Sequence, residues 1–392
     1  MLLVLALLVQ QPVTRADAAA AALARGARVA LGRADTIAAL GAARTARAFP
    51  NPTVSGSYTK DTPNYHLLGD LPLDLPWLRA PRIGAADAAR DAARYQFAFD
   101  RAGIVFDVDT TYTRALATAM HARLSRRTAD DADSLLKIAQ LRRDVGDVSE
   151  LDVRLAAVNA GQLENAAVDD SLTALGTLLV LQLQMGLQGD DPAIALIDSL
   201  AAPQDSAASG GGPMPGEYLP VAAAAARLRS AERTVTFTRA SRFAPSVEFG
   251  FDKGDPASTQ PDALLPVIGF SLPFPLFHHS GGEVTRAIAE RDRARAELDL
   301  TRRATDAAVA RARRELIAAR DRARRSADLV TSANRIAGMS LQAYGEGAVA
   351  LATVLEAQRN AREILARYID DLAAADAALR MLRWLTATAG QP

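Results

Sequence analysis

The chain has 392 residues, with 45 basic and 45 acidic side chains and no cysteine. This length allows two or three domains or one elongated repeat structure, and the charge balance excludes the single-sign surface of a nucleic-acid-binding protein. The absence of cysteine excludes disulfides and thiol catalysis, while the abundance of alanine, leucine, arginine and acidic residues favours long helices over a thick globular core.

The amino-terminal segment, residues 1–13, begins with the apolar run 1–9, which is too short to span a bilayer. The run fits the hydrophobic region of a secretory signal, although a basic start and a small-residue cleavage site are missing. The alternative is a buried first turn of a helix. No other window predicts a transmembrane helix, so any crossing of a membrane is expected to use strands.

A first structural repeat is expected over residues 14–188. It opens with an alanine-rich amphipathic helix over 14–48, with Thr14 or Asp17 as the candidate cap and Gly26 as a weak point. Two prolines then end the helix, because proline breaks the hydrogen-bond ladder. The hydrophobic period changes from 3.6 to 2, which predicts strands over about 53–60 and 67–75.

A helical hairpin over about 82–188 completes this repeat, with its turn at 144–153. Between Ala85 and Val145 the one helix breaker is a single glycine, so the first arm is about 90 Å long at about 1.5 Å per residue. A linker follows over 189–216, where Gly, Pro and Ser accumulate.

The second repeat is expected over residues 217–388 and follows the same order of elements. Its strands are predicted over about 245–253 and 264–274, and its helical hairpin over about 282–386, with the turn at 344–354. The segment 146–159 recurs 201 positions later at 347–360. The coinciding pairs are Gly146 and Gly347, Val148 and Val349, Val153 and Val354, Ala156 and Ala357, and Asn159 and Asn360. This recurrence indicates an internal duplication.

The four strands present an apolar face and a polar face. Val247, Phe249 and Phe251 alternate with Ser246, Glu248 and Asp252, and ten of the twenty aromatic residues lie in the two strand windows. A dry core would not accept the polar face unpaired, and an open sheet exposes two edges. A membrane barrel with lipid on its outer face and water on its inner face explains the pattern. A soluble two-sheet sandwich is the alternative.

Both turns resemble those of the TolC-like outer membrane efflux family. The first reads Gly146-Asp-Val-Ser149-Glu-Leu-Asp152-Val153, and the second reads Tyr344-Gly-Glu-Gly347-Ala-Val-Ala350-Leu-Ala-Thr353-Val354-Leu355-Glu356-Ala357. The order of helix, two strands and helical hairpin, occurring twice, covers nearly the whole chain. The motif Leu272-Pro-Phe-Pro-Leu-Phe277 is similar to the branch that serves heavy-metal and cation pumps.

The resemblance implies a mainly α fold with a small membrane β part. Three chains would form a homotrimer with a twelve-stranded barrel in the outer membrane lipid and a periplasmic tunnel of long helices. The tips of the tunnel would bind a periplasmic adaptor (membrane fusion) protein of an inner-membrane efflux pump. The docking residues this assigns are Gly146, Val148, Ser149, Leu151, Asp152, Val153, Gly347, Val349, Ala350 and Val354.

The resemblance also assigns the periplasmic aperture to Thr353 and Glu356. The family often carries two acidic residues there, so this chain departs from the pattern at Thr353 and, by replacing a serine, at Ala350. A ring of three Glu356 carboxylates would favour cations. The alternative is a surface pair between Glu356 and Arg359.

No catalytic, cofactor or metal motif is found in the sequence. The neighbours His278 and His279 lack carboxylate or thiolate company, and no phosphate-binding loop or nucleophile elbow occurs. The sequence therefore predicts an exit duct that conducts metal cations or small molecules passively, and not an enzyme or a nucleic-acid-binding protein. A soluble periplasmic coiled-coil adaptor or scaffold is the alternative.

Overall fold

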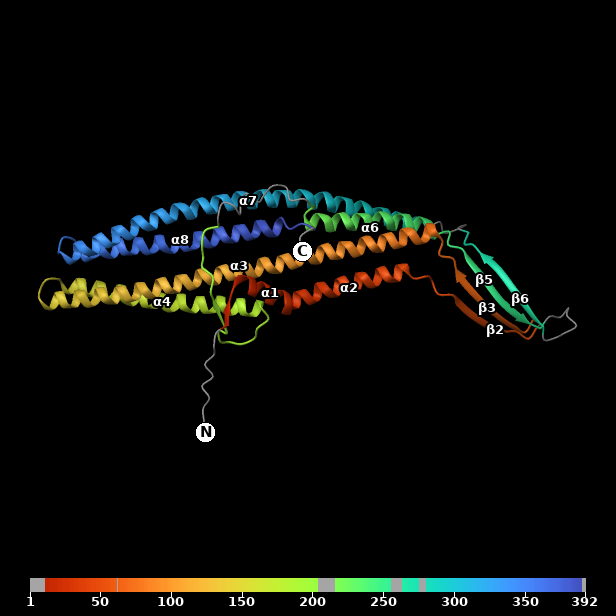
Figure 1. The fold of residues 1–392 in the computed structure, drawn as a ribbon, viewed down its shortest axis with the longest axis horizontal. Helices are drawn as coiled ribbons and strands as arrows, with labels where there is room; N and C mark the ends of the chain where they lie inside the picture. Colours follow the sequence, from red (N-terminus) through yellow and green to blue (C-terminus); the bar gives the residue numbers. More distant parts are fainter. Residues whose placement is uncertain (1–10, 62, 204–215, 255–262, 275–279, 390–392) are drawn as a thin grey trace, which may run out of the picture. The chain divides into compact units, whose positions relative to one another are not determined.

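The computed structural model describes residues 11–61, 63–203, 216–254, 263–274 and 280–389, and it is mainly helical (Figure 1). The helices are α1 (Arg15–Arg25), α2 (Ala27–Arg47), α3 (Pro76–Asp144), α4 (Glu150–Gln184), α6 (Leu219–Ser241), α7 (Gly281–Gly345) and α8 (Leu351–Leu385). The strands are β1 (Gln11–Val13), β2 (Thr53–Tyr58), β3 (Tyr65–Pro72), β4 (Ile194–Leu196), β5 (Ser246–Lys253) and β6 (Leu264–Ser271).

These elements form two compact units that cut across the two sequence repeats. Unit 1 contains Met1–Ala30, Asp100–Gly216 and Asp306–Pro392, and unit 2 contains Leu31–Phe99 and Glu217–Thr305. Unit 1 therefore holds both helical turns, and unit 2 holds the four-stranded sheet. Most of the expected amino-terminal segment, residues 1–10, lies outside the described residues, as do His278 and His279.

The first expected helix is two helices, so the prediction of one helix over 14–48 is corrected. α1 begins after Thr14, whose side chain accepts from the Asp17 amide while Asp17 accepts from the Thr14 amide. This reciprocal capping box satisfies amide groups that have no partner inside the helix. Gly26 then leaves the helical region, with φ −67° and ψ 129°, and α2 starts at the next residue.

The first long helix begins at Pro76, about six residues before the expected start of the hairpin. Proline fits a first helical position, because the amide it lacks has no intrahelical partner there. Asp74 precedes the helix with a side chain that is 1% exposed, and it accepts from Arg79 at 2.8 Å and Arg82 at 2.7 Å. The return helix α4 is shorter than expected and ends at Gln184.

One helix passes the length and composition test for a membrane span, contrary to the sequence-based expectation. It is α4, whose most apolar window is 17% buried and has a mean hydropathy of 1.3. An alanine- and leucine-rich helix with an exposed apolar face gives the same result, so length and composition do not establish a span here.

Both hairpins share a contact that the duplication explains. Ser125 on α3 donates to Asp170 on α4, and Ser326 on α7 donates to Asp371 on α8 at 2.5 Å. Each residue of the second pair lies 201 positions after its counterpart, which is the offset of the two turns. The duplication therefore extends to packing between the arms of each hairpin.

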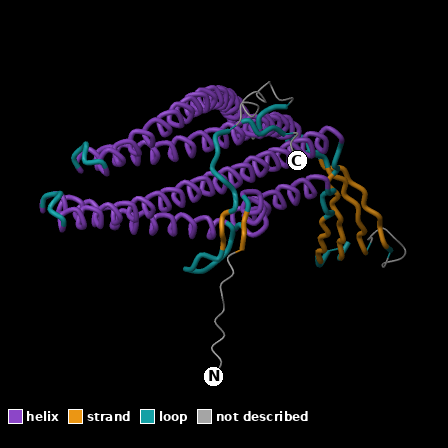
Figure 2. The backbone as a smooth tube through the Cα atoms, turned by 60° about the vertical axis from the view of Figure 1, so that its left-hand side comes forward, coloured by secondary structure: helices purple, strands orange, loops and turns teal. Residues whose placement is uncertain are grey.

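The four strands of unit 2 lie side by side in one sheet (Figure 2). The sheet is antiparallel, and its strand order is β2-β3-β5-β6. β3 of the first repeat pairs with β5 of the second, for example Leu67 with Phe251, so the sheet joins the two repeats. The strands β2 and β6 are its unpaired edges. Gly69 leaves room for the ring of Phe249, because a Cβ there would lie 2.8 Å from a ring carbon.

A second sheet, of two parallel strands, lies in unit 1 and was not predicted. Gln11 pairs with Ile194 and Val13 with Leu196. The side chain of Gln182, 1% exposed, fixes the approach to β4 by donating to the Asp191 carbonyl and accepting from the Ala193 amide. The expected linker 189–216 thus contains an ordered strand.

Candidate functional site

The first turn, between α3 and α4, is closed by backbone and side-chain hydrogen bonds. Gly146 has φ +81°, and its amide donates to the Arg143 carbonyl at 2.8 Å, while the Asp147 amide donates to the Arg142 carbonyl at 2.9 Å. This pair of bonds is the Schellman arrangement that needs a left-handed residue after a helix. Ser149 then caps α4 in a capping box with Asp152.

The second turn has the same backbone and lacks the side-chain cap. Gly347 has φ +74°, and the amides of Gly347 and Ala348 repeat the two bonds at 3.0 and 2.8 Å. The residue before α8 is Ala350, which has no side-chain oxygen to offer the first amides of the helix. The two turns therefore differ in capping and agree in backbone.

Exchanging the capping groups should shift local stability in opposite directions. Ser149→Ala is expected to destabilise the start of α4 by about 1 kcal/mol, and Ala350→Ser to stabilise the start of α8 by a similar amount. Amide hydrogen exchange near each turn would measure both effects. The prediction fails if Ala350→Ser leaves exchange at residues 351–353 unchanged.

Arg142 connects the two turns within unit 1. Its Nε atom donates to Asp147 at 2.6 Å, and Nη1 donates to the Tyr344 carbonyl at 3.0 Å. The guanidinium also lies 4.8 Å from the centroid of the Tyr344 ring, a cation–π contact. One side chain of the first hairpin thereby holds the end of the first arm of the second hairpin.

The predicted docking residues divide into a buried set and a surface set. Val153 and Val354, which are 7% and 0% exposed, belong to a core that the two hairpins share, so neither is a contact surface. Val153 is three residues before the buried Ala156 of α4, and Val354 is three residues after the buried Leu351 of α8, so each lies on the inward face of its helix. Leu151 is 65% exposed. The other predicted positions that are exposed or half-buried are Gly146, Val148, Ser149, Asp152, Gly347, Val349 and Ala350.

The predicted aperture residues, Thr353 and Glu356, are both exposed on α8. Arg359 forms its ion pair with Glu363, with Nε 2.8 Å from Oε1, and the charge of Glu356 adds to the raised pKa of Arg359. The Glu356 carboxylate lies at the surface, about one helical turn after Thr353.

The strands carry side chains of opposite character on their two faces, as predicted. Directly opposed residues of an antiparallel pair share a face. The apolar face is formed by Val54, Gly56, Tyr58, Tyr65, Leu67, Gly69, Leu71, Val247, Phe249, Phe251, Lys253, Leu264, Pro266, Ile268 and Phe270. The polar face includes His66, Asp70, Glu248 and Asp252. Ile268 is 85% exposed, so the apolar face is uncovered in the single chain.

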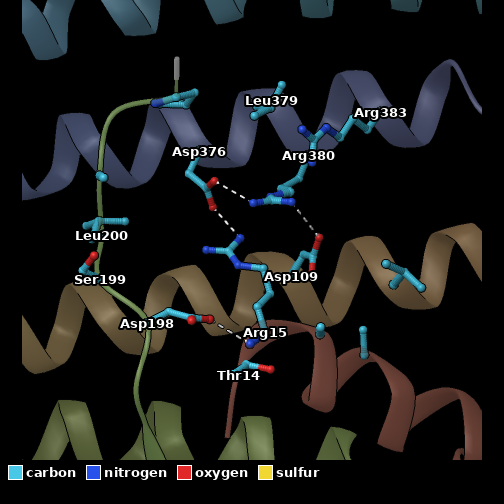
Figure 3. A pocket seen from close by; sticks show the side chains of 15 residues that line it. Thr14, Arg15, Asp109, Asp198, Ser199, Leu200, Asp376, Leu379, Arg380 and Arg383 are labelled. Carbon is cyan, nitrogen blue, oxygen red and sulfur yellow. Dashed lines mark hydrogen bonds and ion pairs between the residues drawn. The ribbon is translucent and has the colours of Figure 1, made fainter. Parts of the chain in front are cut away.

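A cleft of about 800 Å³ in unit 1 holds a charged cluster that the sequence did not predict (Figure 3). Asp376 on α8 accepts from Arg15 at 2.6 Å and lies 3.2 Å from Arg380, which also pairs with Asp109 of α3. The Arg15 amide donates to Asp198 at 2.8 Å. The cluster ties the start of α1 to α3, α8 and the segment after β4.

The pKa values of Asp109 and Asp376 in this cluster are shifted in opposite directions. Burial raises the pKa of Asp109, and the opposing charges of Arg380 and Arg15 only partly offset it. Burial also acts on Asp376, but the hydrogen bond from Thr113 and the charges of Arg15 and Arg380 outweigh it, so the pKa of Asp376 is lowered. Paired guanidinium groups thus keep Asp376 ionised.

Within the described ranges, no group of three or more His, Asp or Glu side chains is arranged to hold a metal ion. The closest pair on the sheet is His66 with Asp252, whose Nδ1 and Oδ1 atoms are 2.9 Å apart. Two ligands do not make a structural metal site.

Comparison with known sequences supports the resemblance. The model of the outer membrane efflux protein family matches residues 219–388. The cobalt-zinc-cadmium resistance protein CzcC of Cupriavidus metallidurans is 25% identical over 268 residues, which cover 64% of this chain and 60% of CzcC. The pyoverdine export outer membrane protein OpmQ of Pseudomonas aeruginosa is 28% identical over 288 residues, which cover 68% of this chain and 58% of OpmQ. The chain thus matches about three fifths of each relative's length.

Solved structures share the fold over nearly the whole chain. VceC of Vibrio cholerae has a TM-score of 0.77 at 16% identity, covering 95% of this chain and 96% of VceC. CusC has a TM-score of 0.77 at 13% identity, covering 95% and 92%, and MtrE of Neisseria gonorrhoeae has 0.74 at 14%, covering 95% and 88%. Residues 219–388 therefore resemble the outer membrane efflux proteins, and nearly the whole chain has the fold of these channels.

Proposed function

We propose that this chain is the exit duct of a tripartite efflux system. Three copies close their sheets into a twelve-stranded barrel in the outer membrane, and the long helices form a periplasmic tunnel for passive conduction. The observation that carries this proposal is the sheet: it has two unpaired edges, an exposed apolar face and a polar face. In such a barrel the edges pair with neighbouring copies, the apolar face meets lipid, and the polar face lines the water-filled lumen, so all three features are satisfied.

Fractionation tests this proposal against a soluble periplasmic adaptor or scaffold. The full chain should be recovered from outer membranes as a trimer that requires detergent. A soluble monomer would contradict the proposal. The matching family model is that of outer membrane efflux proteins, OpmQ is an export outer membrane protein and MtrE is an outer membrane channel, which favours the duct over the adaptor.

The cargo class is proposed from the relatives and from the polar face. CzcC confers resistance to cobalt, zinc and cadmium, and OpmQ exports pyoverdine. The polar face carries the carboxylates of Asp70, Glu248 and Asp252. Negative groups along a water-filled lumen favour cations, so metal cations fit this lining better than anionic small molecules.

The two turns are the proposed docking site for a periplasmic adaptor protein that links the duct to an inner-membrane pump. Val148 and Leu151 are the residues best placed to contact it, because Leu151 is 65% exposed and Val148 is half-buried beside it. Val153 and Val354 would support this surface from the core below.

A charge at the exposed apolar positions of the first turn should weaken adaptor binding. Val148→Asp and Leu151→Asp are expected to reduce adaptor cross-linking about tenfold, because a buried unpaired carboxylate at an interface costs more than about 1.4 kcal/mol. Val158→Asp is the matched control, since Val158 is also an exposed apolar residue of α4, at 61%. Undiminished cross-linking of both turn variants would remove this assignment.

Glu356 is the proposed selectivity position of the periplasmic aperture. In a trimer, three copies of this exposed carboxylate would surround the axis and attract cations. Glu356→Gln should lower the cation-over-anion permeability ratio of the reconstituted channel, and Glu363→Gln, which removes the partner of Arg359, should not. An unchanged ratio in Glu356→Gln would exclude the ring.

A further inference from the structure

A pocket of about 470 Å³ lies between the two helical hairpins, within unit 1. It is lined by α3 of the first hairpin and by α7 and α8 of the second. Each of these helices contributes four residues at the spacing i, i+3, i+4 and i+7, which is one face of a helix. On α8 the four are Gln358, Ala361, Arg362 and Leu365. The pocket is therefore formed by three helix faces that converge.

Four side chains of this lining carry N–H donors that have no protein acceptor. Among the described residues, no hydrogen bond or ion pair is formed by the side chains of Arg127, Asn334, Gln358 and Arg362. The neighbour of Arg127 on α3 differs, because Arg126 pairs with Glu164 of α4, with Nη2 2.6 Å from Oε2. The donors of the pocket are thus available to a ligand that offers oxygen acceptors.

Arg362 is partly removed from water without an ion-pair partner among the described residues. Its side chain is half-buried, and burial lowers its pKa because the guanidinium loses hydration there. The charge of Glu363 offsets this effect only in part, and Glu363 forms its own ion pair with Arg359 at 2.8 Å. An anion beside Arg362 would compensate for the lost hydration of its charge.

The remaining lining is apolar apart from one carboxylate. Each helix supplies a leucine, and these are Leu124, Leu341 and Leu365. The carboxylate is that of Asp131, which is exposed on α3. Two guanidinium groups against one carboxylate leave the lining with an excess of one positive charge. A monoanion balances this excess, whereas a dianion such as a phosphate exceeds it and is repelled more strongly by Asp131.

We propose that this pocket binds a small organic carboxylate. Its carboxylate group binds the guanidinium groups of Arg127 and Arg362, and its apolar body packs against the leucine side chains. The planar guanidinium fork matches the two oxygens of a carboxylate, and the amides of Asn334 and Gln358 add neutral donors. A volume of about 470 Å³ lies within the range of small-molecule sites. The bound carboxylate links α3 to α8.

Benzoate and benzamide test the pocket, because they share a ring and differ in the charge of the head group. Isothermal titration calorimetry of the full chain in non-ionic detergent micelles would measure the affinity for each. Wild type should bind benzoate about tenfold more tightly than benzamide. Arg127→Gln and Arg362→Gln should each lower benzoate affinity about tenfold and leave benzamide affinity unchanged. Arg126→Gln is the matched control, because Arg126 is adjacent to Arg127 and is paired with Glu164.

Two further variants keep the outcome decisive. Asp131→Asn should raise benzoate affinity, because it removes a repulsive charge from the lining. Gly338→Leu should weaken the binding of both ligands by filling the pocket, and it should preserve the fold. A Cβ at Gly338 meets no atom within 4 Å, and leucine favours a helix more than glycine does. No measurable benzoate binding by wild type, equal affinity for the two ligands, or wild-type benzoate affinity in both arginine variants would overturn the proposal.

Discussion

Replacing Ile268 by arginine is expected to destabilise the membrane-inserted sheet by about 2–4 kcal/mol per chain. Ile268 lies on the apolar face of β6 opposite Phe249 and is 85% exposed in the single chain. In a bilayer this surface would face acyl chains, where a guanidinium loses its hydration without gaining a partner. In water the same substitution on an exposed strand position would be nearly neutral.

The adjacent residue provides the control. Val267 lies on the polar face, opposite Gly250, and its diagonal neighbours on β5 are Glu248 and Asp252. Val267→Arg places the same charge on the same strand and should leave the trimer intact. Urea titration of the protein refolded into lipid vesicles, with recovery from outer membranes as a second readout, compares the two. If Ile268→Arg and Val267→Arg behave alike, the apolar face does not meet lipid.

The strands and turns could be predicted because their signals are local. The alternation in residues 246–253 has period 2, which a helix cannot use, and the glycines at 146 and 347 both adopt the left-handed conformation that ends a helix. The repeat offset then confirms that the two turns are equivalent. Local chemistry of this kind is visible in a single sequence.

The pairing of β1 with β4 could not be predicted in the same way. Each strand has three residues, too few to show a period, and the register joins Gln11 to Ile194 across the whole first repeat. The helix break at Gly26 is a second feature that could not be predicted. Glycine lowers helix stability by about 1 kcal/mol, which weakens a helix without deciding whether it ends there.

The charged cluster in unit 1 was missed because its members are distributed along the chain. Arg15, Asp109, Asp198 and Asp376 come from four separate segments, and each alone is indistinguishable from a solvated helix charge. A chain with 45 acidic and 45 basic residues offers many such pairs. The buried positions of Val153 and Val354 were missed for a related reason, because a motif gives identity at a position and not its exposure.

Replacing Asp376 by asparagine should destabilise unit 1 by about 3–5 kcal/mol, the usual cost of leaving buried partners uncompensated. The Asp376 side chain is 9% exposed and accepts from Arg15, Arg380 and Thr113. Its loss removes the ion pair of Arg15 with Asp376 and leaves Arg380 paired with Asp109. Asp370→Asn is the matched control. That carboxylate is 70% exposed beside His121, and its loss should cost less than about 1 kcal/mol.

The pH dependence gives an independent test of the same cluster. The pKa of Asp376 is lowered from its ordinary value of 3.8, so its stabilisation is complete above that value and is lost as pH falls through the lower folded-state pKa. The pKa of Asp109 is raised above 3.8, so Asp109 takes up its proton at a higher pH than Asp376 does, and that protonation favours the fold. Asp376→Asn should therefore reduce the loss of stability below pH 3.8 in urea titrations of the detergent-solubilised assembly. An acid limb identical to wild type would show that Asp376 does not supply it.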